Sequence, residues 1–138
     1  MKFDIDYLLK EKLLMKIPSS KQKAEESIKT AFSWLEESKN NFKNKQFKSC
    51  VLTSYLSIFH SARAILFFDG FREKSHFAVA RYLEFKYSGK LEKKWIELID
   101  YYRDLRHQDQ YRTSFVVHED EAGKSLDSAN KFVARMNK

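Results

Sequence analysis

Glycine, proline and cysteine are scarce in this 138-residue chain, which contains three, one and one of them, respectively. Because glycine and proline are the usual residues of tight turns, their scarcity favours long regular elements. The one cysteine, Cys50, cannot form a disulfide within the chain, which indicates a reducing, intracellular setting. Three glycines also supply no phosphate-cradling glycine loop.

The usual patterns for metal binding, secretion and membrane insertion are missing as well. None of the four histidines stands at a recognised ligand spacing from another histidine, a cysteine or a carboxylate. The sequence therefore predicts no metal and no cofactor. Charged residues interrupt the apolar residues of the N-terminus, unlike those of a signal peptide, and no apolar run approaches the roughly 20 residues that cross a bilayer. We expect a cytoplasmic protein without a membrane span.

Apolar residues recur three and four positions apart along most of the chain, which is the spacing of an amphipathic helix. The clearest stripe is Leu91, Trp95, Leu98, Tyr102 and Leu105. This pattern predicts an all-α fold, an up-and-down bundle of five to six antiparallel helices with short loops. The expected helices cover residues 7–15, 20–41, 47–68, 76–87, 91–105 and 119–136.

No linker, low-complexity segment or repeat divides the chain, so we expect one domain over residues 1–138. Residues 1–17 should form a short N-terminal helix that packs on the bundle or extends it. Ser19, with Gln22 three residues later, matches a capping box at the start of the next helix. The segment 113–117, TSFVV, has strand-like composition but is isolated, and we expect an extended connector there.

The stretch YYRDLRHQDQYR, residues 101–112, concentrates the groups that could carry chemistry. On a helix, Arg106 falls at the border between the apolar stripe and solvent, and Arg103 lies three residues from Arg106 and four from His107. Two guanidiniums and an imidazole form a plausible phosphate-recognition surface, which the net charge of +7 would support. In the alternative, the cluster is a surface ion-pair network with the nearby carboxylates of Asp100, Asp104 and Asp109.

His60 is a second candidate for ligand binding. It follows Phe59 on the most apolar of the expected helices, and Arg63 stands three residues later. It is either a histidine at the edge of the core that holds a hydrogen bond or a ligand contact.

Two segments resemble the HEPN-domain family, and most closely its small stand-alone archaeal and bacterial branch. The first is SYLSIFHSARAILFFDGFREKSHFAVARYLEFKY, residues 54–87, and the second is YYRDLRHQDQY, residues 101–111. The resemblance extends over about residues 18–136. It implies a helical bundle, usually a symmetric homodimer, with a cleft at the dimer interface formed by the second segment of both subunits.

The resemblance also implies two functions. Many HEPN proteins are metal-independent ribonucleases, and others are encoded with a small nucleotidyltransferase as a toxin–antitoxin-like pair. The nucleases carry an arginine that stabilises phosphate charge and, with four to six residues between the two, a histidine that transfers a proton. With Arg106 placed on that arginine, Tyr111 stands at the position of the histidine, and His107 stands where asparagine is common.

We therefore expect a protein that binds a nucleotide, RNA or a nucleotidyltransferase partner, with Arg103 and Arg106 on the phosphate and His107 and Tyr111 assisting. An alternative is an active ribonuclease in which Arg106 and His107 are catalytic. A second alternative is a helical interaction scaffold that binds no ligand, although the 34-residue repeat typical of such scaffolds is absent.

Overall fold

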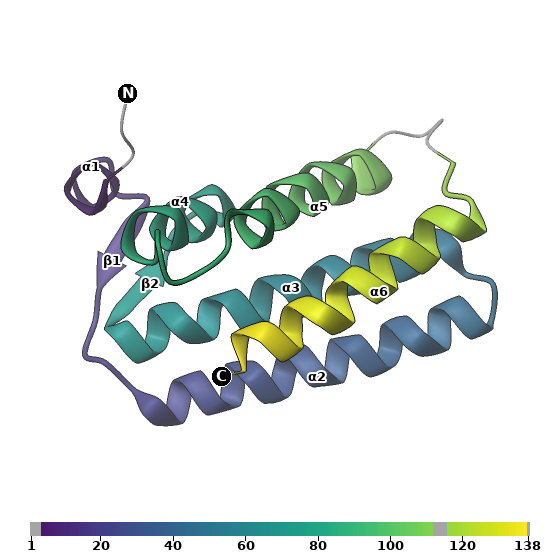
Figure 1. Cartoon of the computed structure of the whole chain (residues 1–138), viewed down its shortest axis with the longest axis horizontal. Helices are drawn as coiled ribbons and strands as arrows, with labels where there is room; N and C mark the ends of the chain where they lie inside the picture. The colour runs from purple at the N-terminus through teal and green to yellow at the C-terminus, as the bar shows by residue number, and fades with distance from the viewer. Residues whose placement is uncertain (1–3, 112–115, 138) are drawn as a thin grey trace.

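The computed structural model describes residues 4–111 and 116–137, with side chains up to His107 in the first range. Within these ranges it contains six helices and two short strands (Figure 1). Their bounds are α1 Ile5–Lys10, β1 Leu14–Lys16, α2 Lys21–Lys43, α3 Phe47–Asp69, β2 Phe71–Glu73, α4 His76–Lys86, α5 Lys93–Tyr111 and α6 Glu119–Met136. The predicted all-α bundle is confirmed. Most of the connector predicted at 113–117 lies outside the described residues.

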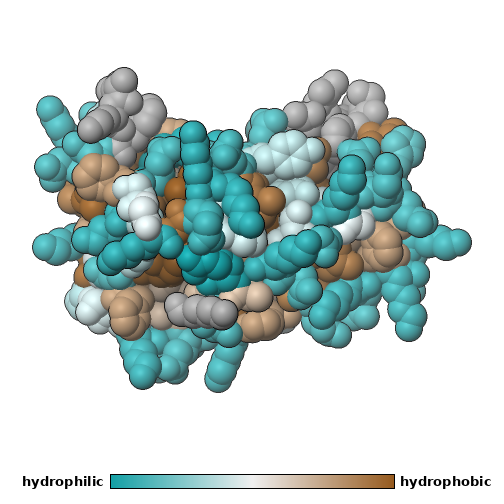
Figure 2. All heavy atoms as spheres, in the orientation of Figure 1, coloured by the Kyte–Doolittle hydropathy of each residue, from teal (hydrophilic) through white to brown (hydrophobic). Residues whose placement is uncertain are grey.

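The helices pack in two layers around α3. The long helices α2 and α3 lie side by side and antiparallel, and α6 covers the groove between them (Figure 1). On the other side of α3, α4 and α5 form the second layer, next to the two-stranded β1–β2 sheet. Hydrophilic side chains cover most of the face seen in Figure 2, and apolar side chains show between the helices. Every helix contributes to one apolar core.

Helix α3 is buried on nearly all sides, because its apolar residues occupy two neighbouring stripes. By length and composition it is the one described helix that could cross a membrane. Most of its apolar stretch is buried within the bundle, however, and the core helix of a soluble protein has the same composition.

Two local predictions at the N-terminal side are wrong. The helix expected at residues 7–15 ends at Lys10, and Leu14–Lys16 instead forms β1, which pairs antiparallel with β2. The start of α2 is capped by Ser20 and not by Ser19: the Ser20 hydroxyl accepts a hydrogen bond from the Lys23 amide at 3.0 Å. Both segments are too short for periodicity to decide between helix, strand and loop.

Gly70 makes the connection from α3 to β2 possible. It terminates α3 with a φ of 90°, in the left-handed region that suits glycine. A Cβ there would stand 3.0 Å from the carbonyl oxygen of Ile17, so a larger residue would force the backbone to shift. The chain can therefore leave α3 and pair at once with β1.

An ion pair joins β2 to α3. Arg63 donates from Nε and Nη2 to the two carboxylate oxygens of Glu73, at 2.7 and 2.6 Å. The Glu73 side chain is 4% exposed and that of Arg63 is 24% exposed. A bidentate pair with so little solvent fixes the position of β2, and hence the start of α4, relative to α3.

We expect Glu73→Gln to destabilise the fold, because it leaves the half-buried Arg63 guanidinium without its counter-charge. The free energy of unfolding should fall by about 3 kcal/mol, at the low end for a broken buried pair since part of Arg63 reaches solvent. Urea denaturation measures the change. Arg72→Gln, on the exposed side of the same strand, is the control and should shift it by less than about 0.5 kcal/mol. Equal midpoints for wild type and Glu73→Gln would contradict the anchoring role.

Candidate phosphate-binding site

The two arginines of α5 point toward the core. The buried residues of α5 are Ile96, Ile99 and Tyr102, whereas Trp95, Leu98 and Leu105, which the sequence placed at the centre of the apolar face, are only partly buried. Arg103 and Arg106 follow Ile99 by four and seven residues, so both continue this inner face. Arg106 is therefore further inside than the expected border position, with its guanidinium carbon 5.2 Å from the centroid of the Tyr55 ring.

A cavity of about 320 Å³ opens between α5 and the start of α4. It brings together three predicted site residues, Arg103, Arg106 and His107, with the first residues of α4. Among the described residues, the lining consists of Ser75, His76, Phe77, Arg103, Asp104, Arg106 and His107. A cavity of this size is large enough for a phosphate and part of a nucleotide.

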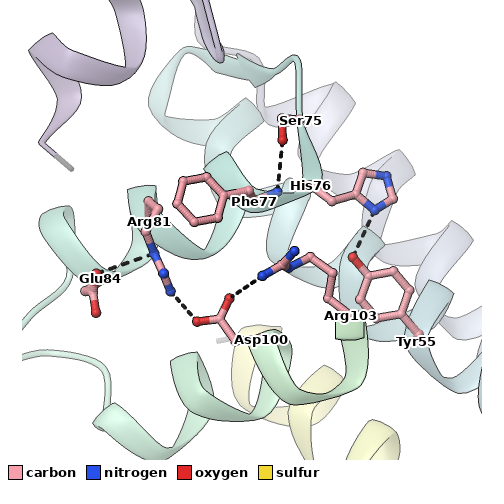
Figure 3. Close-up of polar contacts among 8 residues, drawn as sticks. All are labelled: Tyr55, Ser75, His76, Phe77, Arg81, Glu84, Asp100 and Arg103. Atoms are coloured by element: carbon pink, nitrogen blue, oxygen red, sulfur yellow. Dashed lines mark hydrogen bonds and ion pairs between the residues drawn. The ribbon is translucent and has the colours of Figure 1, made fainter. Parts of the chain in front are cut away.

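Arg103 is held by an aromatic ring and a shared carboxylate. Asp100 turns one oxygen toward Arg81 and the other toward Nη2 of Arg103, which is 3.5 Å away (Figure 3). The guanidinium carbons of Arg81 and Arg103 lie 5.1 and 5.8 Å from the centroid of the Phe77 ring. The ion pairing expected from Asp100 is thus present, but Arg81 takes the closer contact. Nε of Arg103 is buried and has no hydrogen-bond partner among the described residues.

His76 is fixed by two residues of α3. Its Nδ1 is hydrogen bonded to the Tyr55 hydroxyl at 2.9 Å (Figure 3), and its ring stacks on Phe59 with the centroids 3.9 Å apart. Ser75 caps α4 by accepting a hydrogen bond from the Phe77 amide at 3.2 Å, so His76 is the first helical residue. The helix cap and the ring stacking together hold the imidazole in one position beside the arginines.

Both partners of this hydrogen bond are uncharged at neutral pH. Burial lowers the pKa of His76 below its ordinary 6.5, and the nearby charge of Arg106 lowers it further, while Glu73 opposes the shift. Burial raises the pKa of Tyr55 to about 12, against the opposing influence of Arg106 and Arg103.

Two predicted residues are not brought into the described lining. His60 lies on α3, where its carbonyl oxygen accepts a hydrogen bond from the Ser27 hydroxyl at 2.6 Å and its ring meets the Phe59 ring edge-on. Burial, followed by the charge of Arg63, lowers its pKa. The backbone of Tyr111 ends α5, but its side chain lies outside the described residues. A ligand role for either residue stays a prediction.

His76 and Tyr55 were not predicted as site residues from the sequence. Tyr55 was assigned to an apolar stripe, and His76 had no marker beyond its place at the start of a helix. A polar hydroxyl within an apolar stripe is a weak signal that a partner is needed in the core. Among the described residues, no group of three or more histidine, cysteine, aspartate or glutamate side chains could hold a metal ion.

Comparison with known proteins gives two matches. A family model described as "HEPN domain" matches residues 24–138, from the first turn of α2 onward. A protein of Methanocaldococcus jannaschii named "Putative toxin MJ0605" is 32% identical over 113 residues, which cover 80% of this chain and 84% of the relative. The family match includes all the described residues that line the cavity.

The half-buried, uncharged state of His76 predicts a loss of stability in acid. The unfolded chain takes up the proton near pH 6.5 and the folded chain only at lower pH, so unfolding is favoured as the pH falls below 6.5, by at most about 1.4 kcal/mol per pH unit. The free energy of unfolding, measured by urea denaturation at pH 7 and at pH 5, should therefore differ less between the two pH values in His76→Gln than in wild type. His118→Gln, at the exposed N-cap of α6, should keep the wild-type difference.

Proposed function

Since this chain belongs to the HEPN family, we propose that it is a toxin-like member that binds RNA through a phosphate group in the cavity between α4 and α5. The single observation that carries the proposal is the convergence of Arg103 and Arg106 on that cavity. A guanidinium offers a planar fork of donors that matches two phosphate oxygens. A partly enclosed cavity strengthens this attraction, because little water competes for the donors.

Aromatic rings contact both arginines of the cavity. Tyr55 lies under Arg106 and Phe77 lies beside Arg103. A ring attracts a cation through its quadrupole and carries no opposite charge of its own. These ring contacts therefore help to hold the guanidiniums without adding an opposite charge of their own, within a chain whose net charge is +7.

The family and the name of the archaeal relative support a toxin-like role. We propose a cytoplasmic homodimer in which the C-terminal ends of both α5 helices border one cleft. A small nucleotidyltransferase encoded beside it would act as antitoxin. Residues 1–138 would form a single domain, with the N-terminal helix and β1 packed on the bundle.

A second candidate function is metal-independent RNA cleavage. The specific observation in its favour is that two histidines, His76 and His107, line the same cavity as the two arginines. Phosphate-binding groups beside imidazoles are the parts that acid–base cleavage of a phosphodiester requires. A scaffold without a ligand would have no use for this arrangement.

We expect Arg106→Ala to weaken RNA binding by about 2 kcal/mol, or on the order of 30-fold, which is typical of removing a hydrogen bond to a charged group. Fluorescence anisotropy with a 5′-fluorescein-labelled, 20-nucleotide single-stranded RNA measures the dissociation constant. The dissociation constant of Arg106→Lys should lie between those of wild type and Arg106→Ala, because lysine keeps the charge but loses the planar fork of donors. The salt dependence should become shallower in Arg106→Ala by about 0.7 in log–log slope for each phosphate that is no longer neutralised.

Arg135→Ala is the matched control for this measurement. It removes the same charge, but Arg135 belongs to α6, pairs with Glu92 and does not line the cavity. Its dissociation constant should stay within about three-fold of wild type. If Arg106→Ala and Arg135→Ala weakened RNA binding equally, the binding would be explained by the overall surface charge and not by the cavity. No RNA binding by the folded wild-type protein would leave the scaffold alternative.

The toxin role predicts that the chain slows growth when a bacterial host produces it alone. Arg106→Ala should restore growth at an equal level of soluble protein, because the phosphate site is lost, and Arg135→Ala should remain toxic. Growth curves with immunoblots of the soluble fraction measure both quantities. Normal growth with the wild-type protein would argue against the toxin role, whatever the RNA affinity.

A further inference from the structure

The cavity holds two histidines in different settings. His107 belongs to the exposed side of α5, one residue after Arg106. His76 is half-buried at the start of α4, with one face of its ring on Phe59 and Nδ1 on the Tyr55 hydroxyl. A group that transfers a proton in a reaction must be held within a fraction of an ångström of its working position. The structure provides this restraint for His76.

The hydrogen bond to Tyr55 decides which imidazole nitrogen is available. Because Nδ1 is engaged with the hydroxyl, Nε2 is the nitrogen left for a substrate in the cavity. A neutral hydroxyl both donates and accepts. When the proton of the neutral ring is on Nε2, the Tyr55 hydroxyl can therefore donate to Nδ1. When Nδ1 carries a proton, in the other neutral tautomer or in the imidazolium, the hydroxyl can accept from Nδ1–H instead.

The charges around His76 suit a base that acts only with substrate present. The groups facing it are Tyr55 and Arg63 from α3, Glu73 from β2, and Arg103 and Arg106 from α5. Burial, and then the charge of the arginines, disfavours a positive imidazole, so the ring stays neutral in the free protein. A bound phosphate would offset their charge and make the imidazolium less costly. Asp104 also lines the cavity.

We propose that His76 is the general base of an RNA-cleaving site in this cavity, with Tyr55 as its positioning residue. This inference rests on the proposed RNA binding. The ribose 2′-oxygen attacks the adjacent phosphorus and forms a new P–O bond while its proton passes to Nε2 of His76. The bond from phosphorus to the 5′-oxygen breaks, and that oxygen takes a proton from water. Arg103 and Arg106 stabilise the charge that develops on the phosphoryl oxygens.

The products follow from this proton path. One fragment ends in a 2′,3′-cyclic phosphate and the other begins with a 5′-hydroxyl, and His76 returns its proton to solvent. A substrate without a 2′-hydroxyl cannot react. Tyr111 stands at the sequence position of the family's histidine. The proposed step does not use Tyr111, because His76 of α4 takes over the proton transfer of that histidine.

The test is single-turnover cleavage of the labelled 20-nucleotide RNA in buffer with EDTA, alongside the anisotropy measurement on the same samples. His76→Gln should bind RNA within about three-fold of wild type and cleave it on the order of 100-fold more slowly, as for a lost general base. His118→Gln is the matched control and should cleave at the wild-type rate. DNA of the same sequence should stay intact.

Tyr55→Phe separates positioning from simple packing. It keeps the ring under Arg106 but removes the acceptor for Nδ1–H of the protonated imidazole. The rate should fall, and the acidic limb of the pH–rate profile should move to lower pH. If the cleavage rate fell but the acidic limb of the pH–rate profile stayed in place, Tyr55 would contribute through packing alone.

Two outcomes overturn the inference while leaving the proposed RNA binding intact. One is a wild-type protein that binds the RNA and does not cleave it. The other is cleavage that survives in His76→Gln and disappears in His107→Gln, which would assign the base to His107. Loss of RNA binding in the wild type is a different result, because it removes the proposed function itself.

Discussion

The buried pair of Arg63 and Glu73 is the interaction on which the candidate site depends. It ties β2 to α3 through two short hydrogen bonds, in a place where Glu73 meets almost no water. Two residues after Glu73, Ser75 caps α4, and His76 begins the helix. Because only two residues separate Glu73 from His76, the Arg63–Glu73 pair restricts where His76 can lie, and so sets its contacts with Tyr55 and Phe59.

Helix α3 gives the site its second fixed component. Tyr55 and Phe59 are one helical turn apart on the same face, and both are buried against the rest of the bundle. The opposite side of the helix is satisfied by small polar groups: Ser38 of α2 hydrogen bonds to the hydroxyl of Ser54 at 2.7 Å and to the carbonyl oxygen of Cys50 at 3.0 Å. Contacts on both sides keep the aromatic pair in one position. The site therefore inherits the rigidity of the core.

Periodicity was sufficient to predict the long helices, because each must bury one face and the spacing of apolar residues records it. It also brought Arg103, Arg106 and His107 together, since they are neighbours on one helix. It failed where contacts cross the chain. The strand Leu14–Lys16 exists through its pairing with β2, and His76 is a site residue through contacts with α3. The shift of the buried face of α5 toward Ile99 has the same origin, because packing selected one of two overlapping stripes.

The arginines of this chain show how a fold can separate structural cations from functional ones. Arg63 meets a buried carboxylate at 2.6 Å, so its charge is matched within the fold. Arg81 contacts both Asp100 and Glu84, and it is likewise matched. Arg103 receives only the longer contact from Asp100 and a place beside Phe77, and Arg106 lies over Tyr55. Aromatic contact does not distinguish the two groups, because Arg63 lies over Phe59 and Arg81 shares the Phe77 ring with Arg103. What sets Arg103 and Arg106 apart is their place: both belong to the described lining of the cavity, and Arg63 and Arg81 do not.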